Sequence, residues 1–189
     1  MSNKEGHLFV VSGPSGTGKS TLIERFLAED PEVRFSVSYT TRQRRPHEVD
    51  GKNYRFVDAE TFQKMIEARG FLEWENVHGY YYGTPAEEVA HPLSEGFDVV
   101  LDIDVKGALA VKARCAEAVL IFVDTPSVDE LVRRLSIRGE KEIEKRMERV
   151  REEVAKKGLF TYTVINDKIE RAYGEFISII TQVRRQHHG

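Results

Sequence analysis

The sequence is poor in the features that would tie it to a membrane or to an oxidising compartment. It has 189 residues and a single cysteine, Cys115, so an intrachain disulfide is excluded. No run approaches the roughly 18–20 apolar residues that a membrane-spanning helix needs. Residues 1–6 also lack the apolar segment of a signal peptide. We therefore expect a cytoplasmic protein without membrane partners.

A strong charge of either sign is lacking as well. The chain has 28 Lys and Arg against 31 Asp and Glu, a formal net charge of −3, which gives no reason to expect nucleic-acid binding. Its 40% apolar and 31% charged residues are typical of a soluble globular protein, and its length suits one domain with a real core. The sequence leaves open whether that domain is a monomer or a homo-oligomer.

The clearest motif that is present lies near the N-terminus. Gly13, Gly18, Lys19 and Ser20 occupy the fixed places of the pattern G-x-x-x-x-G-K-[ST]. An apolar run precedes the motif and a segment with helical spacing follows it, which is the context that a phosphate-binding loop requires. A plain Gly/Ser-rich turn would not need the lysine–serine pair at this offset. The motif therefore predicts nucleoside triphosphate binding.

The residue types of this loop explain the chemistry. Glycines let successive backbone N–H groups turn inward, and the following helix adds the positive end of its dipole. Lys19 can reach the terminal phosphates, and the Ser20 hydroxyl can ligate Mg²⁺. We therefore expect Mg²⁺ as the cofactor, with ATP as co-substrate.

Short apolar runs alternate with helical patterns along the rest of the chain. Residues 33–39 alternate apolar and polar side chains and predict one strand. Residues 99–104 and 119–123 are nearly continuous apolar runs, typical of strands buried on both faces. Strands that alternate with helices predict an α/β fold with a mostly parallel sheet. Residues from about 39 to 91 interrupt this order with short strands and helices, and they form a predicted insertion.

Four polar residues fall near the ends of these predicted elements. Asp102 and Asp104 are two apart in a predicted strand, so both should point to one face at the sheet edge where ligands bind. Thr84 begins a segment with the form of a capping box, and Asn166 precedes an amphipathic helical pattern. Thr84 and Asn166 could therefore simply be helix caps, and Thr84 could combine capping with a nucleotide contact.

The sequence resembles guanylate kinases over nearly its whole length. The phosphate loop alone fits many families, but the ordered set of the other matching segments is specific. The matching segments are residues 12–21, 37–42, 50–54, 71–74, 81–84, 101–104, 134–135 with 138–139, and 165–167.

The resemblance implies a fold and a reaction. It implies a three-layer α/β/α core with a mostly parallel sheet, an inserted GMP-binding subdomain and a helical lid. The core would take about residues 1–35, 92–132 and 158–189, the subdomain about 36–91, and the lid about 133–157. The implied reaction is ATP + GMP ⇌ ADP + GDP with Mg²⁺, a step of purine nucleotide metabolism whose partners are two small molecules.

The resemblance also implies roles for individual residues. The residues that would bind ATP are Ser12, Gly13, Pro14, Ser15, Gly16, Thr17, Gly18, Lys19, Ser20, Thr21, Arg134 and Asn166. Those that would bind GMP are Ser38, Arg42, Arg45, Tyr54, Glu73, Tyr82, Thr84 and Asp104. The residues expected to act in phosphoryl transfer are Lys19, Arg42, Asp102, Arg138 and Arg146. Ser20 and Asp102 would hold Mg²⁺, the latter through water.

The chemistry of guanine and phosphate agrees with these roles. Guanine presents its N1–H and its N2 amino group side by side, and the carboxylate of Glu73 could accept from both. Adenine would present the unprotonated N1 to that carboxylate. Arginine suits the monophosphate because its planar fork binds phosphate oxygens bidentately.

The lid departs from the family pattern. The segment after Arg138 is about three residues short, so two residues compete for the place of the second lid arginine. The local context Ile-Glu-Lys-Arg-Met selects Arg146, whereas the usual spacing selects Arg149. We favour Arg146, because a loop absorbs a deletion more easily than a helix changes its register.

Two other functions fit parts of the sequence. One is a kinase for AMP or a pyrimidine monophosphate, against which Glu73 and residues 38–42 argue. The other is a guanylate-kinase-like scaffold domain that binds proteins without catalysis. Such domains typically lose the phosphate loop, which is intact here.

Overall fold

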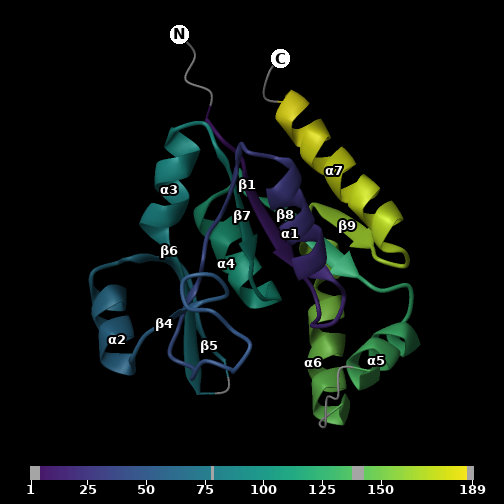
Figure 1. Ribbon diagram of the computed structural model, residues 1–189, viewed down its shortest axis with the longest axis horizontal. Coiled ribbons are helices and arrows are strands. Elements are labelled where there is room, and N and C mark those ends of the chain that lie inside the picture. Colours follow the sequence, from purple (N-terminus) through teal and green to yellow (C-terminus); the bar gives the residue numbers. More distant parts are fainter. Residues whose placement is uncertain (1–4, 78, 138–142, 187–189) are drawn as a thin grey trace.

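The computed structural model describes residues 5–77, 79–137 and 143–186, with backbone only for residues 143–146. A central sheet has the strand order β2-β7-β1-β8-β9, and each neighbouring pair is parallel (Figure 1). This arrangement confirms the predicted mostly parallel sheet. Its strands are β1 (Leu8–Ser12), β2 (Val33–Phe35), β7 (Asp98–Asp102), β8 (Val119–Asp124) and β9 (Tyr162–Ile165).

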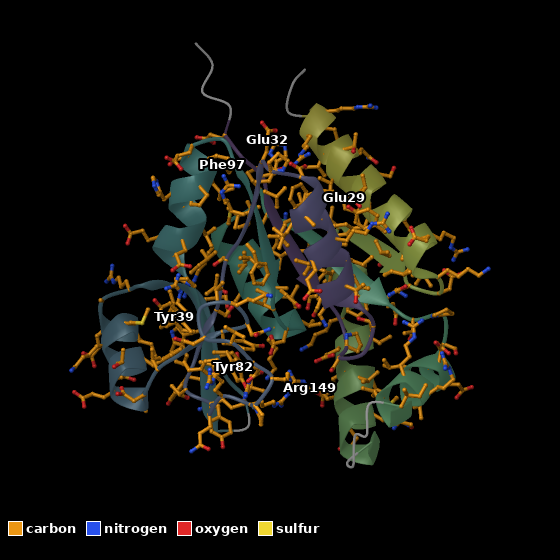
Figure 2. All side chains as sticks on the ribbon, in the orientation of Figure 1. Glu29, Glu32, Tyr39, Tyr82, Phe97 and Arg149 are labelled. Atoms are coloured by element: carbon orange, nitrogen blue, oxygen red, sulfur yellow. The ribbon has the colours of Figure 1, made fainter. Side chains whose placement is uncertain are left out.

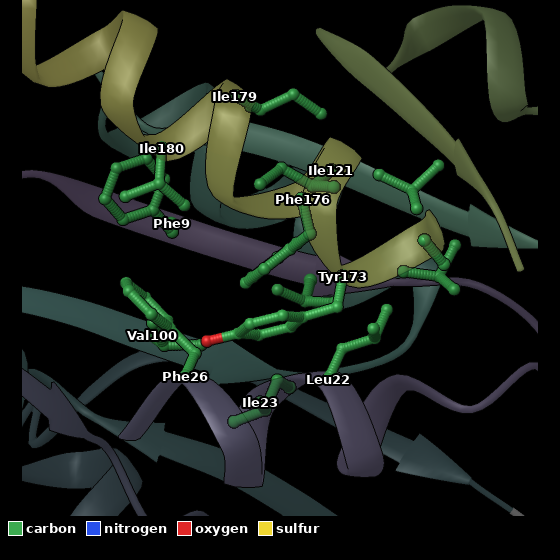
Figure 3. Packing of buried hydrophobic residues seen from close by; sticks show 14 of the residues in the cluster. Phe9, Leu22, Ile23, Phe26, Val100, Ile121, Tyr173, Phe176, Ile179 and Ile180 are labelled. Atoms are coloured by element: carbon green, nitrogen blue, oxygen red, sulfur yellow. The ribbon is translucent and has the colours of Figure 1, made fainter. Parts of the chain in front are cut away.

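Helices cover both faces of this sheet. Alternate residues of β1 point to opposite sides: Phe9 and Val11 pack with one helical layer, and Leu8 and Val10 pack with the other. Figure 3 shows the first of these two cores. The three-layer architecture is confirmed, and burial on both faces explains the continuous apolar runs of the strands. One layer contains α1 (Lys19–Glu29) and α7 (Ile169–Gln186), and the other α3 (Ala86–Ser94) and α4 (Val105–Arg114).

A second sheet, of order β4-β3-β6-β5, lies to one side below the core (Figure 1). Phe62 of the adjacent α2 is fully buried and stacks on Phe71 and Tyr81, with ring centroids 4.4 and 5.4 Å away. Asp58 caps α2 by accepting from the Thr61 N–H, as its position predicts. The elements are β3 (Tyr39–Thr40), β4 (Arg55–Phe56), α2 (Ala59–Glu67), β5 (Phe71–Val77) and β6 (Tyr80–Pro85).

The prediction of one strand over residues 33–39 was wrong. Val33 pairs with β7 and packs in the core, whereas Tyr39 pairs with β6 and its ring lies 6.0 Å from that of Phe71. Between them the Ser38 carbonyl accepts from the Arg55 N–H at 2.9 Å. An alternating pattern indicates which side chains are buried, but it does not indicate which sheet they pack against. The sequence pattern therefore could not show that the chain leaves the central sheet after β2 and enters the second sheet at β3.

Two further helices lie on the other side of the molecule, α5 (Val128–Ile137) and α6 (Ile143–Ala155), followed by the short η1 (Lys157–Leu159) (Figure 1). Leu131 and Leu135 of α5 are buried against residues of α6 that include Met147 and Val150. This small cluster is separate from the two cores of the sheet. Within the described ranges, the chain contains no helix of the length and apolarity that crossing a membrane requires.

Candidate active site

The loop after β1 is fixed by close backbone packing. Gly13 has φ +130°, and a Cβ there would lie 2.2 Å from the Val123 carbonyl oxygen. Gly18 has φ +93°, and a Cβ would lie 2.3 Å from Nδ2 of Asn166. The buried Thr17 hydroxyl donates to the Pro14 carbonyl at 2.9 Å. Both positions therefore require glycine, because a Cβ atom would lie too close to its neighbours and because other residues disfavour the positive φ.

Lys19 lies folded over this loop. Its ammonium group donates to the carbonyls of Gly13 and Pro14, at 2.7 and 3.2 Å. Within the described chain no side chain caps the start of α1, and its first turn contains no acidic residue. The loop therefore offers a cation and helix N–H groups to an anion.

Asp102 stands next to the loop because β7 pairs with β1, in a register that places it opposite Val11. The Ser20 hydroxyl donates to its Oδ2 at 3.4 Å. Burial raises the pKa of Asp102, and the charge of Lys19 and the hydrogen bond from Ser20 oppose this shift. A carboxylate and a hydroxyl at this spacing suit a hard cation such as Mg²⁺, which prefers oxygen ligands.

Asp104 does not share a strand with Asp102, which corrects the prediction. The strand ends at Asp102, and Asp104 is the N-cap of α4, where its Oδ1 accepts from the Gly107 N–H at 2.8 Å. The two carboxylates thus face the site from a strand end and from a helix start. Capping satisfies an N–H group at the start of the helix, which explains why the strand gives way to α4 at this position.

Glu73 is buried on β5, with 6% of its surface exposed. Its Oε1 accepts from the Thr84 hydroxyl of the neighbouring strand at 2.6 Å. Burial raises the pKa of Glu73, and the negative charge of Asp104 adds to the shift, while the bond from Thr84 opposes it. A buried acidic side chain held in this way can recognise hydrogen-bond donors of a ligand.

Thr84 and Asn166 are not helix caps. The Thr84 hydroxyl donates a hydrogen bond to Glu73, and α3 starts at Ala86 without a side-chain cap. Asn166 precedes α7 by three residues, and its Nδ2 donates to the Thr17 carbonyl at 2.8 Å. Tertiary partners outcompete the local capping pattern at both positions.

A pocket of about 410 Å³ lies beside the phosphate loop. Arg134 borders it and donates to the Asn166 carbonyl at 2.8 Å, which connects α5 to the start of α7. The pocket joins the loop to two residues that the resemblance assigned to ATP. It is lined by Gly16, Gly18, Thr21, Arg134, Ile137, Asn166, Asp167 and Ile169.

Arg42 is held by a residue that the sequence analysis missed. Its guanidinium makes two bonds to Glu48, at 2.7 and 3.0 Å, and its Nε donates to the Tyr82 hydroxyl at 3.2 Å. Glu48 also accepts from the backbone N–H of Arg45, whose side chain is exposed. Arg42 lowers the pKa of Glu48, so the pair stays ionised. The burial of Glu48 is visible only in the structure, so no local sequence pattern singled it out.

Tyr54 lies beside this pair. The centroid of its ring is 5.5 Å from the Arg42 guanidinium carbon and 5.8 Å from the centroid of the Tyr82 ring. Burial, followed by the negative charge of Asp102, raises the pKa of Tyr54 to about 12. Its phenol is therefore neutral near pH 7 and available as a donor to an anion.

The lid arginines are only partly described. Arg138 and the side chain of Arg146 lie outside the described residues. Arg149 of α6 lies 3.4 Å from Asp104 Oδ2 and donates to Glu153 at 2.9 Å. Figure 2 shows Arg149 extending from α6 toward the side on which Tyr82 lies. The choice between Arg146 and Arg149 remains a prediction.

Arg42, Glu48, Tyr54 and Tyr82 together form the Arg42 cluster. This cluster, with the phosphate loop and the buried Glu73, has the features expected of a kinase for guanine nucleotides. A family model described as guanylate kinase matches residues 5–183. The chain belongs to the guanylate kinase family. The guanylate kinase of Caldanaerobacter subterraneus subsp. tengcongensis is 47% identical over 180 residues, which cover 94% of this chain and 87% of that protein.

Other members of the guanylate kinase family agree with this assignment. The guanylate kinase of Thermus thermophilus is 46% identical over 189 residues, covering 98% of this chain and 84% of that protein. The crystal structure of guanylate kinase from Anaplasma phagocytophilum superposes with a TM-score of 0.79 at 29% identity, covering 98% of this chain and 88% of that chain. The similarity thus extends over the core, the second sheet and the helices α5 and α6.

The buried carboxylate of Glu73 should lower stability at neutral pH. Its folded pKa is raised, so stability is greatest below the unfolded pKa and falls as the pH rises through the folded pKa. Glu73→Gln keeps an acceptor for Thr84 and removes the charge, so we expect a higher Tm at pH 7. The gain should shrink toward about pH 4, where a carboxyl group is largely protonated.

Thermal unfolding at several pH values tests this expectation, with Glu24→Gln as the control. Glu24 is exposed in the middle of α1, and its charge is not among the causes that raise the pKa of Glu73. The control should not gain stability at neutral pH. A lower Tm of Glu73→Gln at pH 7 would contradict the cost assigned to the buried charge.

Proposed function

We propose that this chain transfers the γ-phosphoryl group of ATP to GMP, giving ADP and GDP. The observation that carries this function is the buried Glu73, hydrogen-bonded by Thr84 beside Asp104, in a chain with an intact phosphate loop. Thr84 occupies Oε1 of Glu73, and the carboxylate keeps acceptor capacity for guanine N1–H and N2–H. Adenine would bring an unprotonated N1 toward the same negative charge. Ser38 and Asp104 complete the base contacts in this proposal.

The monophosphate of GMP would bind at the Arg42 cluster. Arg42, Arg45, Tyr54 and Tyr82 supply cationic and hydroxyl donors, and Glu48 fixes the orientation of Arg42. Preorganised donors of this kind bind a phosphate dianion without a large reorganisation cost. In this role Arg42 both anchors the acceptor and neutralises its charge.

The triphosphate of ATP would lie in the loop formed by residues 12–21, with its base in the pocket between Arg134 and Asn166. Lys19 would exchange its two loop carbonyls for phosphate oxygens. Ser20 and Asp102 would hold Mg²⁺, Asp102 through water, and the ion would neutralise charge on the phosphates. No general base is required, since phosphoryl transfer rests mainly on positioning and charge stabilisation.

The two lobes beside the core have separate roles in this proposal. Residues of about 36–91 form the GMP-binding subdomain, and residues of about 133–157 form a lid that closes over both nucleotides. Closure would exclude water and bring Arg138 and Arg146 to the transferring phosphoryl group. The substrates are small molecules, and we place the reaction in the cytoplasm.

Removing the Lys19 ammonium should abolish most of the turnover. Lys19→Ala is expected to lower kcat by several orders of magnitude and to leave GMP binding largely intact, because Lys19 faces the ATP phosphates. Turnover by a coupled ADP-release assay and GMP binding by calorimetry test this. Lys64→Ala, at an exposed ion pair on α2, is the control. Turnover above about a tenth of that of the parent chain would refute the role of Lys19.

The preference for guanine over adenine in the acceptor nucleotide should be strong. GMP should exceed AMP in kcat/KM by roughly 10⁴, because a site built for hydrogen bonds leaves buried polar groups unpaired with the wrong base. Glu73→Gln should reduce this ratio, because an amide cannot accept from two donors in the same way. Assays over a panel of nucleoside monophosphates measure the ratio. Equal turnover of AMP and GMP by the parent chain would exclude the guanine assignment.

The two candidate lid arginines should differ in their effects. Arg146→Ala is expected to lower the single-turnover rate by about 10³ or more, the scale of a transition-state arginine. Arg149→Ala should mainly raise KM for GMP, since Asp104, one of its two described partners, belongs to the proposed GMP site. A large rate loss only in Arg149→Ala would reverse the assignment. No loss in either variant would leave Arg134 and Arg138 as the lid arginines.

A further inference from the structure

Gly107 lies where helix α4 meets strand β5, in the first turn of the helix and buried. A Cβ atom at this position would lie 2.9 Å from Glu73 Oε2 and 3.3 Å from its Cδ. The other near atom is Ile103 Cδ1, at 3.4 Å. The absence of a side chain at Gly107 thus leaves the space that one carboxylate oxygen of Glu73 occupies.

Helix α4 cannot easily withdraw to make room for a larger residue. Ala108 and Val111 are fully buried against the sheet. At the other end of the helix, Arg114 donates to the Leu72 carbonyl of β5. A group added at Gly107 must therefore displace the carboxylate, which is the end of a flexible side chain, rather than the backbone.

The same glycine also orients the second acidic group. Its backbone N–H donates to Asp104 Oδ1 at 2.8 Å, while Asp104 Oδ2 faces Arg149 at 3.4 Å. Glu73 and Asp104 are therefore positioned by the missing Cβ and by the N–H group of one residue. This arrangement brings two negative charges close together, and the charge of Asp104 contributes to the raised pKa of Glu73.

We infer that Gly107 is a positioning residue for base recognition, because its missing Cβ fixes where the Glu73 carboxylate meets guanine. The inference rests on the proposed function, in which Glu73 reads the guanine edge. A larger residue at this position moves the carboxylate while the fold, the phosphate loop and the ATP pocket stay as they are. Its effect falls on the acceptor base and not on the donor nucleotide.

The test compares Gly107→Ala with Gly174→Ala. Gly174 also lies inside a helix, but a Cβ there meets no described atom within 4 Å. Both changes reduce the conformational entropy of the unfolded chain, and only Gly107→Ala adds a contact with Glu73. Gly107→Ala should raise KM for GMP by about 10- to 100-fold, because a shift of about 1 Å in a positioned group costs up to about 10². The KM for ATP should stay unchanged, and kcat should change less than about 3-fold.

Selectivity and coupling give two further readouts. The GMP/AMP ratio of kcat/KM should fall in Gly107→Ala and stay at the parent value in Gly174→Ala. In a Glu73→Gln background the Gly107→Ala change should cost much less than in the parent chain, since both changes act on one contact. Full additivity of the two changes would show that Gly107 does not act through Glu73.

The possible failures are distinct from one another. If the parent chain shows no preference for GMP, the proposed function fails, and this inference fails with it. If the parent chain prefers GMP and Gly107→Ala matches Gly174→Ala in KM and in selectivity, only the inference is overturned. An equal rise in KM for ATP and GMP together with a lower Tm would show general damage to the fold and would also overturn it.

Discussion

The parallel pairing of β1 with β7 and β8 is the constraint on which the rest of the site depends. The register that sets Val11 opposite Asp102 and Ser12 opposite Phe122 brings the carboxyl ends of three strands to one edge of the sheet. The phosphate loop leaves from the middle strand, so the acidic residue at the end of β7 lies next to it. Apolar side chains on both faces keep this register, because a shift by one residue would move each strand's core residues to the opposite layer.

Two buried acidic side chains lower the stability of this fold. Glu73 and Asp102 both have raised pKa values because burial disfavours their charged forms, yet the proposed function uses both as anions. Their internal partners compensate only in part: Thr84 for Glu73, and Lys19 and Ser20 for Asp102. Ligands that bring hydrogen-bond donors or a cation supply the remaining compensation. Part of the free energy of ligand binding then comes from relieving groups that the folded chain leaves incompletely paired.

Sequence reasoning worked where function and fold depend on local pattern and failed where they depend on tertiary partners. The loop residues Gly13, Gly18 and Lys19 have fixed spacing, and the buried strands have continuous apolar runs, so both were predictable. Thr84 and Asn166 lie in segments that also fit helix caps, and their contacts with Glu73 and with Thr17 decide their roles. Asp104 is the exception, because a local bond from the Gly107 N–H caps α4 where the sequence pattern predicted a strand. No sequence motif includes Glu48 or Gly107. Their importance follows from distances to Arg42 and Glu73, which no local pattern contains.

The cationic groups of the site, unlike the two buried carboxylates, are bonded to several groups of the protein. Lys19 holds two carbonyls of its own loop, Arg42 holds Glu48 and Tyr82, and Arg149 holds Asp104 and Glu153. Each of these three cations thus has a protein partner, and Tyr82 and Asp104 are among the residues proposed to bind GMP. In the proposed function Lys19 would exchange its two carbonyls for phosphate oxygens, whereas Glu48 would keep Arg42 oriented toward the monophosphate. In the same proposal Lys19 would serve the donor nucleotide and Arg42 the acceptor nucleotide, and the contact of Arg149 with Asp104 would connect the lid to the acceptor side.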